Sequence, residues 1–139
     1  VIKLASIIDE YSGNIKVNIV PFTKLQETIY KNVPDNYVIT IMRRMMYRIA
    51  EKVAKKNKCK ILINGESIGQ VASQTLSSMI VINNVTNMPV IRPVACMDKI
   101  EIIGIAKAKL VGYFLDTFWR FGEHCLCDFV FVSVDVSFV

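Results

Sequence analysis

A polar turn, Asn64-Gly65-Glu66, directly follows the apolar run Cys59–Ile63 and precedes a stretch with helical spacing. In α/β sheets, ligands gather where a strand ends and a helix begins, because the amides at a helix N-terminus attract anions. Gly65 has no side chain to keep a flat ring or a ribose away from the backbone. The turn is therefore a candidate ligand-binding element, although an ordinary strand-to-helix turn has the same composition.

A polar stripe follows this turn. Gln70, Gln74 and Ser77 stand at positions i, i+4 and i+7, which places them on one face of a helix. Their amide and hydroxyl groups suit a base edge or a phosphate, but a solvated helix face has the same pattern.

A cationic strip is the third candidate. Arg44, Arg48, Lys52 and Lys56 recur at four-residue steps along one predicted helix. Such a strip suits a nucleic-acid backbone, because each neutralised phosphate releases counterions. A solvated face with cations near the helix C-terminus explains it equally well. Arg43 lies off the strip, and its planar guanidinium suits one phosphate or carboxylate.

The cysteines allow two further kinds of chemistry. The chain has four, Cys59, Cys96, Cys125 and Cys127, without the spacing of a secreted disulfide scaffold, which favours free thiols. His124 beside Cys125 could activate a reactive thiolate, because a neighbouring imidazolium lowers the pKa of a thiol. Cys125 and Cys127 could also form half of a zinc site, but a structural zinc normally needs a second pair of ligands.

The first half of the chain is expected to position these groups with one strand and two helices. Lys16–Val20 alternates apolar and polar residues like a strand, and Pro21 should close it. Thr23 is a plausible cap for a helix to Asn32, and Asp35 for a long helix after it. That long helix should face the core with a stripe of residues at intervals of three and four: Ile39, Met42, Met46, Ile49 and Val53.

The second half alternates short apolar strands with helices. Cys59–Ile63 is typical of a buried strand, and Ser67 with Gln70 forms a capping box for a helix through Met79. The prolines in Pro89–Pro93 indicate a short edge strand, and Asp98 with Glu101 forms a second capping box. This order predicts an α/β fold with an open, mostly parallel sheet and flanking helices. Residues 128–139 have the composition of a strand, but the sequence leaves their place in the fold open.

Composition narrows the class of protein. A chain of 139 residues is long enough for one core, and 53% hydrophobic with 21% charged residues excludes disorder. No apolar run approaches the ~18 residues of a membrane span, so the expected location is the cytoplasm, with no membrane partner. A net charge of +5 is compatible with a nucleic-acid partner.

Three long segments, read together, resemble the tRNA 4-thiouridine synthase (thiamine-biosynthesis sulfurtransferase) family. They are Ile41–Glu51 (IMRRMMYRIAE), Asn64–Leu76 (NGESIGQVASQTL) and Met97–Ile103 (MDKIEII). Val20–Thr23 and Arg92-Pro93 extend the resemblance, which covers roughly residues 1–107 in order.

The resemblance implies a PP-loop (ATP pyrophosphatase, adenine nucleotide alpha hydrolase-like) domain that acts on tRNA in two stages. ATP, with magnesium, would activate a uracil carbonyl oxygen with release of pyrophosphate. A protein persulfide would then deliver sulfur and displace AMP. The resemblance also implies a cysteine desulfurase as sulfur donor, a link to thiamine thiazole synthesis, and a homodimer as one expected state.

By motif, the resemblance makes Arg43, Gly65 and Gln74 the ATP-contacting residues, and Glu123-His124-Cys125 is similar to the family's Glu-x-Cys, whose cysteine takes part in sulfur transfer. The family's Ser-Gly-Gly-x-Asp-Ser phosphate loop does not occur in this sequence and would precede Val1. We therefore expect an incomplete domain: residues 1–107 as a partial PP-loop domain and residues 108–139 as its divergent C-terminal segment, inactive alone. The alternative is a non-catalytic module that binds an adenine nucleotide or RNA.

Overall fold

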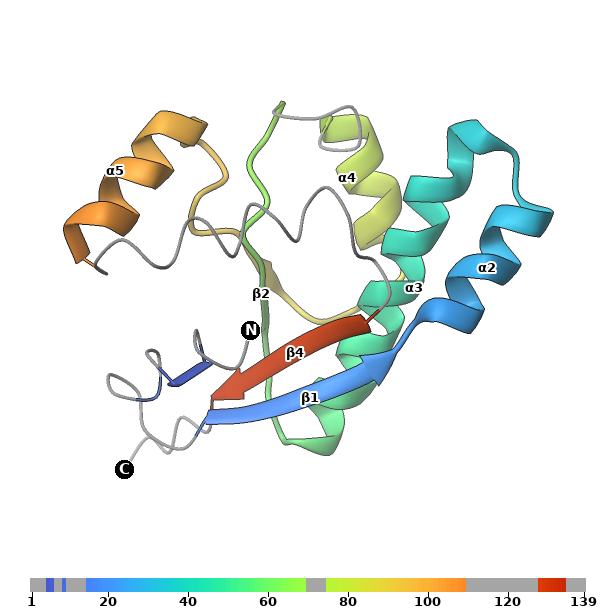
Figure 1. Ribbon diagram of the computed structural model, residues 1–139, viewed down its shortest axis with the longest axis horizontal. Helices are drawn as coiled ribbons and strands as arrows, with labels where there is room; N and C mark the ends of the chain where they lie inside the picture. Colours follow the sequence, from blue (N-terminus) through green and yellow to red (C-terminus); the bar gives the residue numbers. More distant parts are fainter. Residues whose placement is uncertain (1–4, 7–8, 10–14, 70–74, 110–127, 135–139) are drawn as a thin grey trace.

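A computed structural model describes residues 5–6, 9, 15–69, 75–109 and 128–134 of the chain. In chain order, its labelled elements are β1 (Ile15–Pro21), α2 (Thr23–Asn32), α3 (Asp35–Lys56), β2 (Leu62–Ile63), α4 (Leu76–Asn83), β3 (Val90–Ile91), α5 (Lys99–Lys109) and β4 (Asp128–Val134). The long helix α3 is central, since it contacts α2, α4, β2 and β4 (Figure 1).

The apolar core lies between α2 and α3. Its buried residues are Phe22, which directly precedes α2, Ile29 in α2, and three residues on one face of α3: Val38, Met42 and Met46. The predicted stripe of α3 is confirmed at Met42 and Met46, whereas Ile39 is 42% exposed. The buried face instead begins at Val38 and continues through Ala50 and Ala54.

The strands β2 and β3 pair in parallel, Leu62 with Val90 and Ile63 with Ile91, and helices flank them. This arrangement confirms the predicted α/β class with a parallel sheet and the short strand between Pro89 and Pro93. The strand predicted over Cys59–Ile63 is shorter than expected, because only its last two residues pair with β3.

A second pair of strands, β1 and β4, is antiparallel and joins the two ends of the described chain. Its register runs from Ile15 opposite Val134 to Pro21 opposite Asp128. The strand expected over Lys16–Val20 is thus confirmed and extends through Pro21. The pairing also gives residues 128–134 of the strand-like C-terminal stretch the place that the sequence left open, while residues 135–139 lie outside the described residues.

Helix starts were predicted with mixed success. The Asp98 capping box is confirmed: the Glu101 amide donates to Asp98 Oδ1, and the Asp98 amide donates to Glu101 Oε2, each at 2.8 Å. The predicted caps Thr23 and Asp35 are wrong, because each is the first residue of its helix and the preceding residue makes no side-chain cap.

The helix expected to begin at Ser67 has its described start at Leu76, where Thr75 Oγ1 accepts from the Ser78 amide. Ser67 instead donates its hydroxyl to the Met97 carbonyl at 2.6 Å. Gly69 adopts φ +80°, a left-handed conformation that a continuous right-handed helix does not contain. The capping box at Ser67 was therefore a wrong prediction.

In the described ranges, no helix combines the length and the apolar character needed to cross a lipid bilayer.

Candidate functional site at the carboxyl ends of β2 and β3

Two polar residues stand directly after the paired strands. Asn64 follows β2 and Arg92 follows β3, so the parallel register brings them to the same edge of the sheet. The backbone amide of Asn64 continues the hydrogen-bond ladder of the two strands by donating to the Ile91 carbonyl at 3.1 Å. This edge is where open α/β sheets place their ligands.

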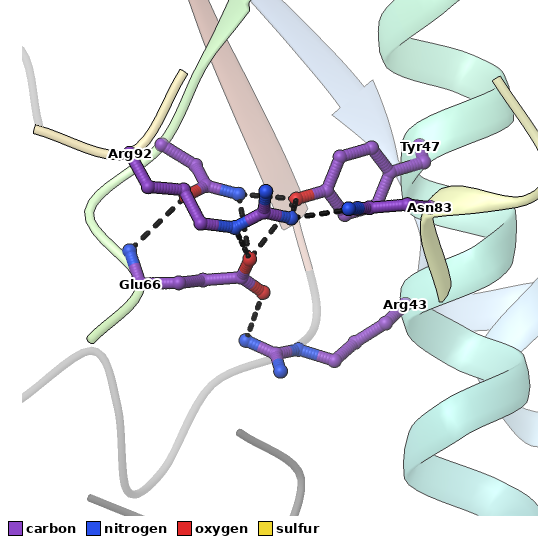
Figure 2. A network of polar contacts seen from close by, with 6 residues as sticks. Arg43, Tyr47, Glu66, Asn83 and Arg92 are labelled. Atoms are coloured by element: carbon purple, nitrogen blue, oxygen red, sulfur yellow. Dashed lines mark hydrogen bonds and ion pairs between the residues drawn. The ribbon is translucent and has the colours of Figure 1, made fainter. Parts of the chain in front are cut away.

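The carboxylate of Glu66 lies at the centre of a polar cluster at this edge. Figure 2 shows it between the guanidinium groups of Arg92 and Arg43. Arg43 Nη2 is 2.5 Å from Glu66 Oε1, and Arg92 Nε is 2.8 Å from Glu66 Oε2. The Glu66 side chain is 9% exposed, so this is a largely buried carboxylate with two cationic partners.

Neutral donors complete the cluster around Oε2 of Glu66. The Tyr47 hydroxyl donates to it at 3.0 Å, and the side-chain nitrogen Nδ2 of Asn64 donates to it at 2.8 Å. Arg92 Nη2 also donates to the Tyr47 hydroxyl at 3.0 Å and to Asn83 Oδ1 at 2.6 Å. The cluster therefore ties together α3, the end of α4 and the turns after β2 and β3.

Asn64 shapes the turn that presents Glu66. Its side-chain oxygen Oδ1 accepts from the Glu66 backbone amide at 3.1 Å, an Asx-type turn across Gly65. The same side chain donates through Nδ2 to the Tyr47 hydroxyl. The side chain of Asn64 thus fixes the backbone of the turn and also orients the Glu66 carboxylate.

The cluster keeps Glu66 ionised. Burial by itself raises the pKa of Glu66, but the hydrogen bond from Arg92 and the charge of Arg43 oppose it, and the pKa is lowered overall. Burial and the neighbouring Glu66 charge raise the pKa of Tyr47 to about 12, so this phenol remains a donor at neutral pH.

Of the residues predicted to contact ATP, two are described. Arg43 belongs to the cluster, and Gly65 is exposed in the turn beside Glu66. Gln74 and its stripe partner Gln70 lie outside the described residues, while Ser77 is exposed near the start of α4. The structure thus brings Arg43 and Gly65 to the same edge of the sheet.

The cationic strip lies on a different side of α3. Arg48, Lys52 and Lys56 are exposed, and a shallow hollow is lined by Arg48, Glu51, Lys52 and Lys55. Arg44 departs from the strip, because its guanidinium donates to the Val81 carbonyl in α4. Three of the four predicted strip residues therefore present charge to solvent.

The structure describes two of the four cysteines. Cys59 and Cys96 are free thiols, as predicted. His124, Cys125 and Cys127 lie outside the described residues. Within the residues that the structure covers, no group of three or more His, Cys, Asp or Glu side chains is placed to hold a metal ion.

Sequence reasoning missed Glu66, Tyr47, Asn83 and Arg92 as members of one site. The available signal was positional: Asn64 and Arg92 are the first residues after two apolar strands. Tyr47 and Arg43 stand four residues apart, so both side chains leave the same face of α3. Asn83 gave no signal, because its role depends on how α4 packs against α3.

Comparisons with known proteins agree on one family. The model of the thiamine biosynthesis protein (ThiI) family matches residues 1–118.

Three similar proteins carry the name "Probable tRNA sulfurtransferase". The one from Anoxybacillus flavithermus is 53% identical over 107 residues, 77% of this chain and 27% of that protein. The one from Halothermothrix orenii is 56% identical over 107 residues, with the same coverage. The one from Bacillus pumilus is 49% identical over 125 residues, 90% of this chain and 31% of that protein. The chain thus spans little more than a quarter of the length of these relatives.

A solved structure is also similar to this chain. It is a crystal structure of a 4-thiouridine synthetase in complex with RNA and with bound ATP. The TM-score is 0.70 and the sequence identity 42%, and the match covers 76% of this chain and 28% of the other. The similarity is therefore one of fold and of sequence together.

Proposed function

Since this chain belongs to the thiamine biosynthesis protein (ThiI) family, we propose that it forms part of a tRNA sulfurtransferase that makes 4-thiouridine at the expense of ATP. The observation that carries the proposal is the 42% identity, with a TM-score of 0.70, to a synthetase bound to RNA and ATP. The identity of about half to the tRNA sulfurtransferases supports it.

The proposed reaction has two steps. In the first, the carbonyl oxygen of a uridine in tRNA attacks the α-phosphorus of ATP, and pyrophosphate leaves. In the second, the terminal sulfur of a protein persulfide attacks the activated carbon, and AMP leaves with the former carbonyl oxygen, which gives a mixed disulfide between the uridine sulfur and the protein cysteine. A second protein thiol then attacks the cysteine sulfur of this disulfide, which releases 4-thiouridine and leaves a protein disulfide that an external thiol reduces. We assign sulfur transfer to Cys125, with a cysteine desulfurase as the source of the persulfide.

The carboxyl edge of β2 and β3 fits part of a nucleotide. Gly65 is exposed there and has no side chain to hinder a ring or ribose. The Arg43 side chain is 20% exposed to solvent. We propose that Arg43 contacts a phosphate, that Gly65 lies against the nucleoside and that Gln74 donates a hydrogen bond to it. Magnesium would accompany the triphosphate through groups other than these three.

The exposed cations of α3 suit the RNA. Arg48, Lys52 and Lys56 form a solvent-facing row that can follow a phosphate backbone, and we propose it as the tRNA contact. Arg44 is a weaker candidate, because its guanidinium is already bonded to α4. We further propose residues 1–107 as the partial PP-loop domain, residues 108–139 as its C-terminal segment, a homodimer in the intact protein, and a cytoplasmic location.

Calorimetric titration with AMP, and with ATP plus magnesium, tests the nucleotide site. We expect AMP to bind and both Arg43→Ala and Gln74→Ala to weaken it by roughly tenfold, the value of one charge-assisted hydrogen bond. Lys24→Ala is the matched control, because Lys24 is an exposed cation on α2. Equal affinities in all four proteins would contradict this placement of the nucleotide.

A chimera tests the reaction itself. This chain would replace the matched segment of the Bacillus pumilus relative, with which it shares 49% identity over 125 residues. The expected result is 4-thiouridine in tRNA, measured by nucleoside chromatography, with a large loss on Arg43→Ala and none on Lys24→Ala. A folded chimera that binds AMP but makes no 4-thiouridine would instead support the non-catalytic module.

A further inference from the structure

We propose that Glu66 is a positioning residue for the nucleotide: its carboxylate holds the guanidinium of Arg43 at the sheet edge in the orientation that meets a phosphate. This inference rests on the proposed nucleotide site and names the residue that orients its phosphate contact. The sequence placed Glu66 in a candidate ligand-binding turn but gave it no role of its own.

The two oxygens of the carboxylate have different partners. Oε2 accepts from Tyr47 in α3, from Arg92 after β3 and from Asn64 in the same turn as Glu66, and these contacts fix the carboxylate in place. Oε1 is 2.5 Å from Arg43 Nη2. The carboxylate is thus anchored through one oxygen and orients Arg43 through the other.

The charges of the cluster favour an anion as its ligand. Two guanidinium groups, Arg43 and Arg92, face one carboxylate, so these three side chains together carry one net positive charge. Arg92 is the more deeply buried, with a side chain 11% exposed against 20% for Arg43. Arg43 is therefore the more accessible of the two guanidinium groups, and it lies on the side of the cluster away from Arg92 (Figure 2).

Positioning matters because an arginine side chain is long and flexible. Its planar fork binds phosphate well only when it is presented at the right angle, and ordering it during binding costs free energy. A carboxylate that already holds one end of the guanidinium removes much of that cost. The ion pair also keeps the cationic group of Arg43 at the edge of the sheet, because its partner Glu66 directly follows Gly65 along the chain.

A purely structural role is the competing explanation, because Glu66 joins α3 to the turns after both strands. The two roles differ in what they do to ligand preference. A positioning role affects the phosphate alone and acts through Arg43, whereas a structural role weakens every part of the nucleotide.

The experiment is a double-mutant cycle on the affinities for AMP and for adenosine, measured by calorimetry. The variants are Glu66→Gln, Arg43→Ala and the two combined. Glu66→Gln keeps the size of the side chain and an oxygen acceptor, which favours a folded protein. We expect each single variant to reduce the preference for AMP over adenosine by roughly tenfold and the double variant to lose little more. Adenosine affinity should change little in any of them.

Tyr47→Phe is the matched control within the same cluster. It removes a donor to Glu66 Oε2 but leaves the pair between Glu66 and Arg43 intact. We expect it to lower stability and to keep the preference for AMP. Losses that add in the double variant, or an equal loss of AMP and adenosine in Glu66→Gln, would overturn the positioning role.

Nitrogen-15 NMR of the arginine side chains gives a second readout without nucleotide. In the unsubstituted chain the Arg43 guanidinium should rotate slowly about its Cζ–Nη bonds, and Glu66→Gln should make that rotation fast. Slow rotation in both proteins would overturn the inference and leave the nucleotide site standing. Failure of the unsubstituted chain to bind AMP, with slow rotation confirmed, would instead count against the proposed function.

Discussion

Two sides of the same helix carry arginines and lysines with different physical roles. On one side of α3, Arg43 meets a largely buried carboxylate from the turn after β2. On the other, Arg48 and Lys52 are exposed around a shallow hollow that also contains Glu51 and Lys55. Cations that are neighbours in the sequence thus divide into one that a buried carboxylate holds and others that are exposed to solvent.

The difference teaches which kind of ligand each side can serve. A guanidinium that is held by a buried carboxylate has one orientation and suits a single, defined anion. Exposed cations along a helix adapt to many phosphates and depend on salt. This division supports a nucleotide phosphate for the first side and an RNA backbone for the second.

The largest expected effect is on the buried side. Glu66→Ala leaves two guanidinium groups facing each other without their carboxylate, and we expect it to lower the free energy of unfolding by about 3 kcal/mol. Urea denaturation followed by circular dichroism measures this. Glu27→Ala, which removes an exposed carboxylate from α2, should change it by less than about 0.5 kcal/mol. Similar losses of unfolding free energy in Glu66→Ala and Glu27→Ala would show that the buried carboxylate contributes no more than an exposed one.

Acid should weaken the buried side in a way that depends on Glu66. Its pKa in the folded protein lies below the ordinary value of a glutamate carboxyl, so the unfolded chain binds the proton more readily. The stabilisation is therefore complete above about pH 4.5 and is lost as the pH falls through the folded pKa. Denaturation midpoints from pH 7 to pH 3 should show the difference between Glu66→Gln and the unsubstituted chain shrinking below that value. A constant difference would contradict the assignment of an ionised Glu66.

Arg44 tests the boundary between the two sides. The sequence places it on the cationic strip, but its guanidinium donates to the Val81 carbonyl of α4. Arg44→Ala should therefore lower the free energy of unfolding by about 0.5–1 kcal/mol, the value of one partly exposed hydrogen bond. Thermal denaturation at neutral pH measures this change. An unchanged free energy of unfolding would indicate that Arg44 is exposed to solvent like Arg48 and Lys52.

The smallest effect on stability is expected from Lys52→Ala, because this side chain is exposed. Its unfolding free energy should stay within about 0.5 kcal/mol of the unsubstituted chain. Its affinity for tRNA should fall a few-fold, and the slope of log affinity against log salt should decrease by about one. Filter binding across a salt series measures both quantities. An unchanged slope would indicate that Lys52 contacts no phosphate.

The local elements were predictable because their signals are local. The Asp98 and Glu101 capping box, the buried Met42 and Met46, and the alternating strand before Pro21 all depend on neighbours within a few residues. Ser67 shows the limit of such signals. The same capping pattern failed there because Gly69 adopts a left-handed conformation and the Ser67 hydroxyl bonds to Met97, thirty residues later.

The sequence by itself determined the α/β class, the family resemblance over residues 1–107 and the candidate status of Arg43 and Gly65, because these depend on periodicity and on contiguous motifs. Only the tertiary structure decided that Glu66, Tyr47, Asn83 and Arg92 form one cluster with Arg43, and that Arg44 leaves the strip. Those contacts join residues up to 45 positions apart, and they form because β2 and β3 pair in register while α3 and α4 pack together.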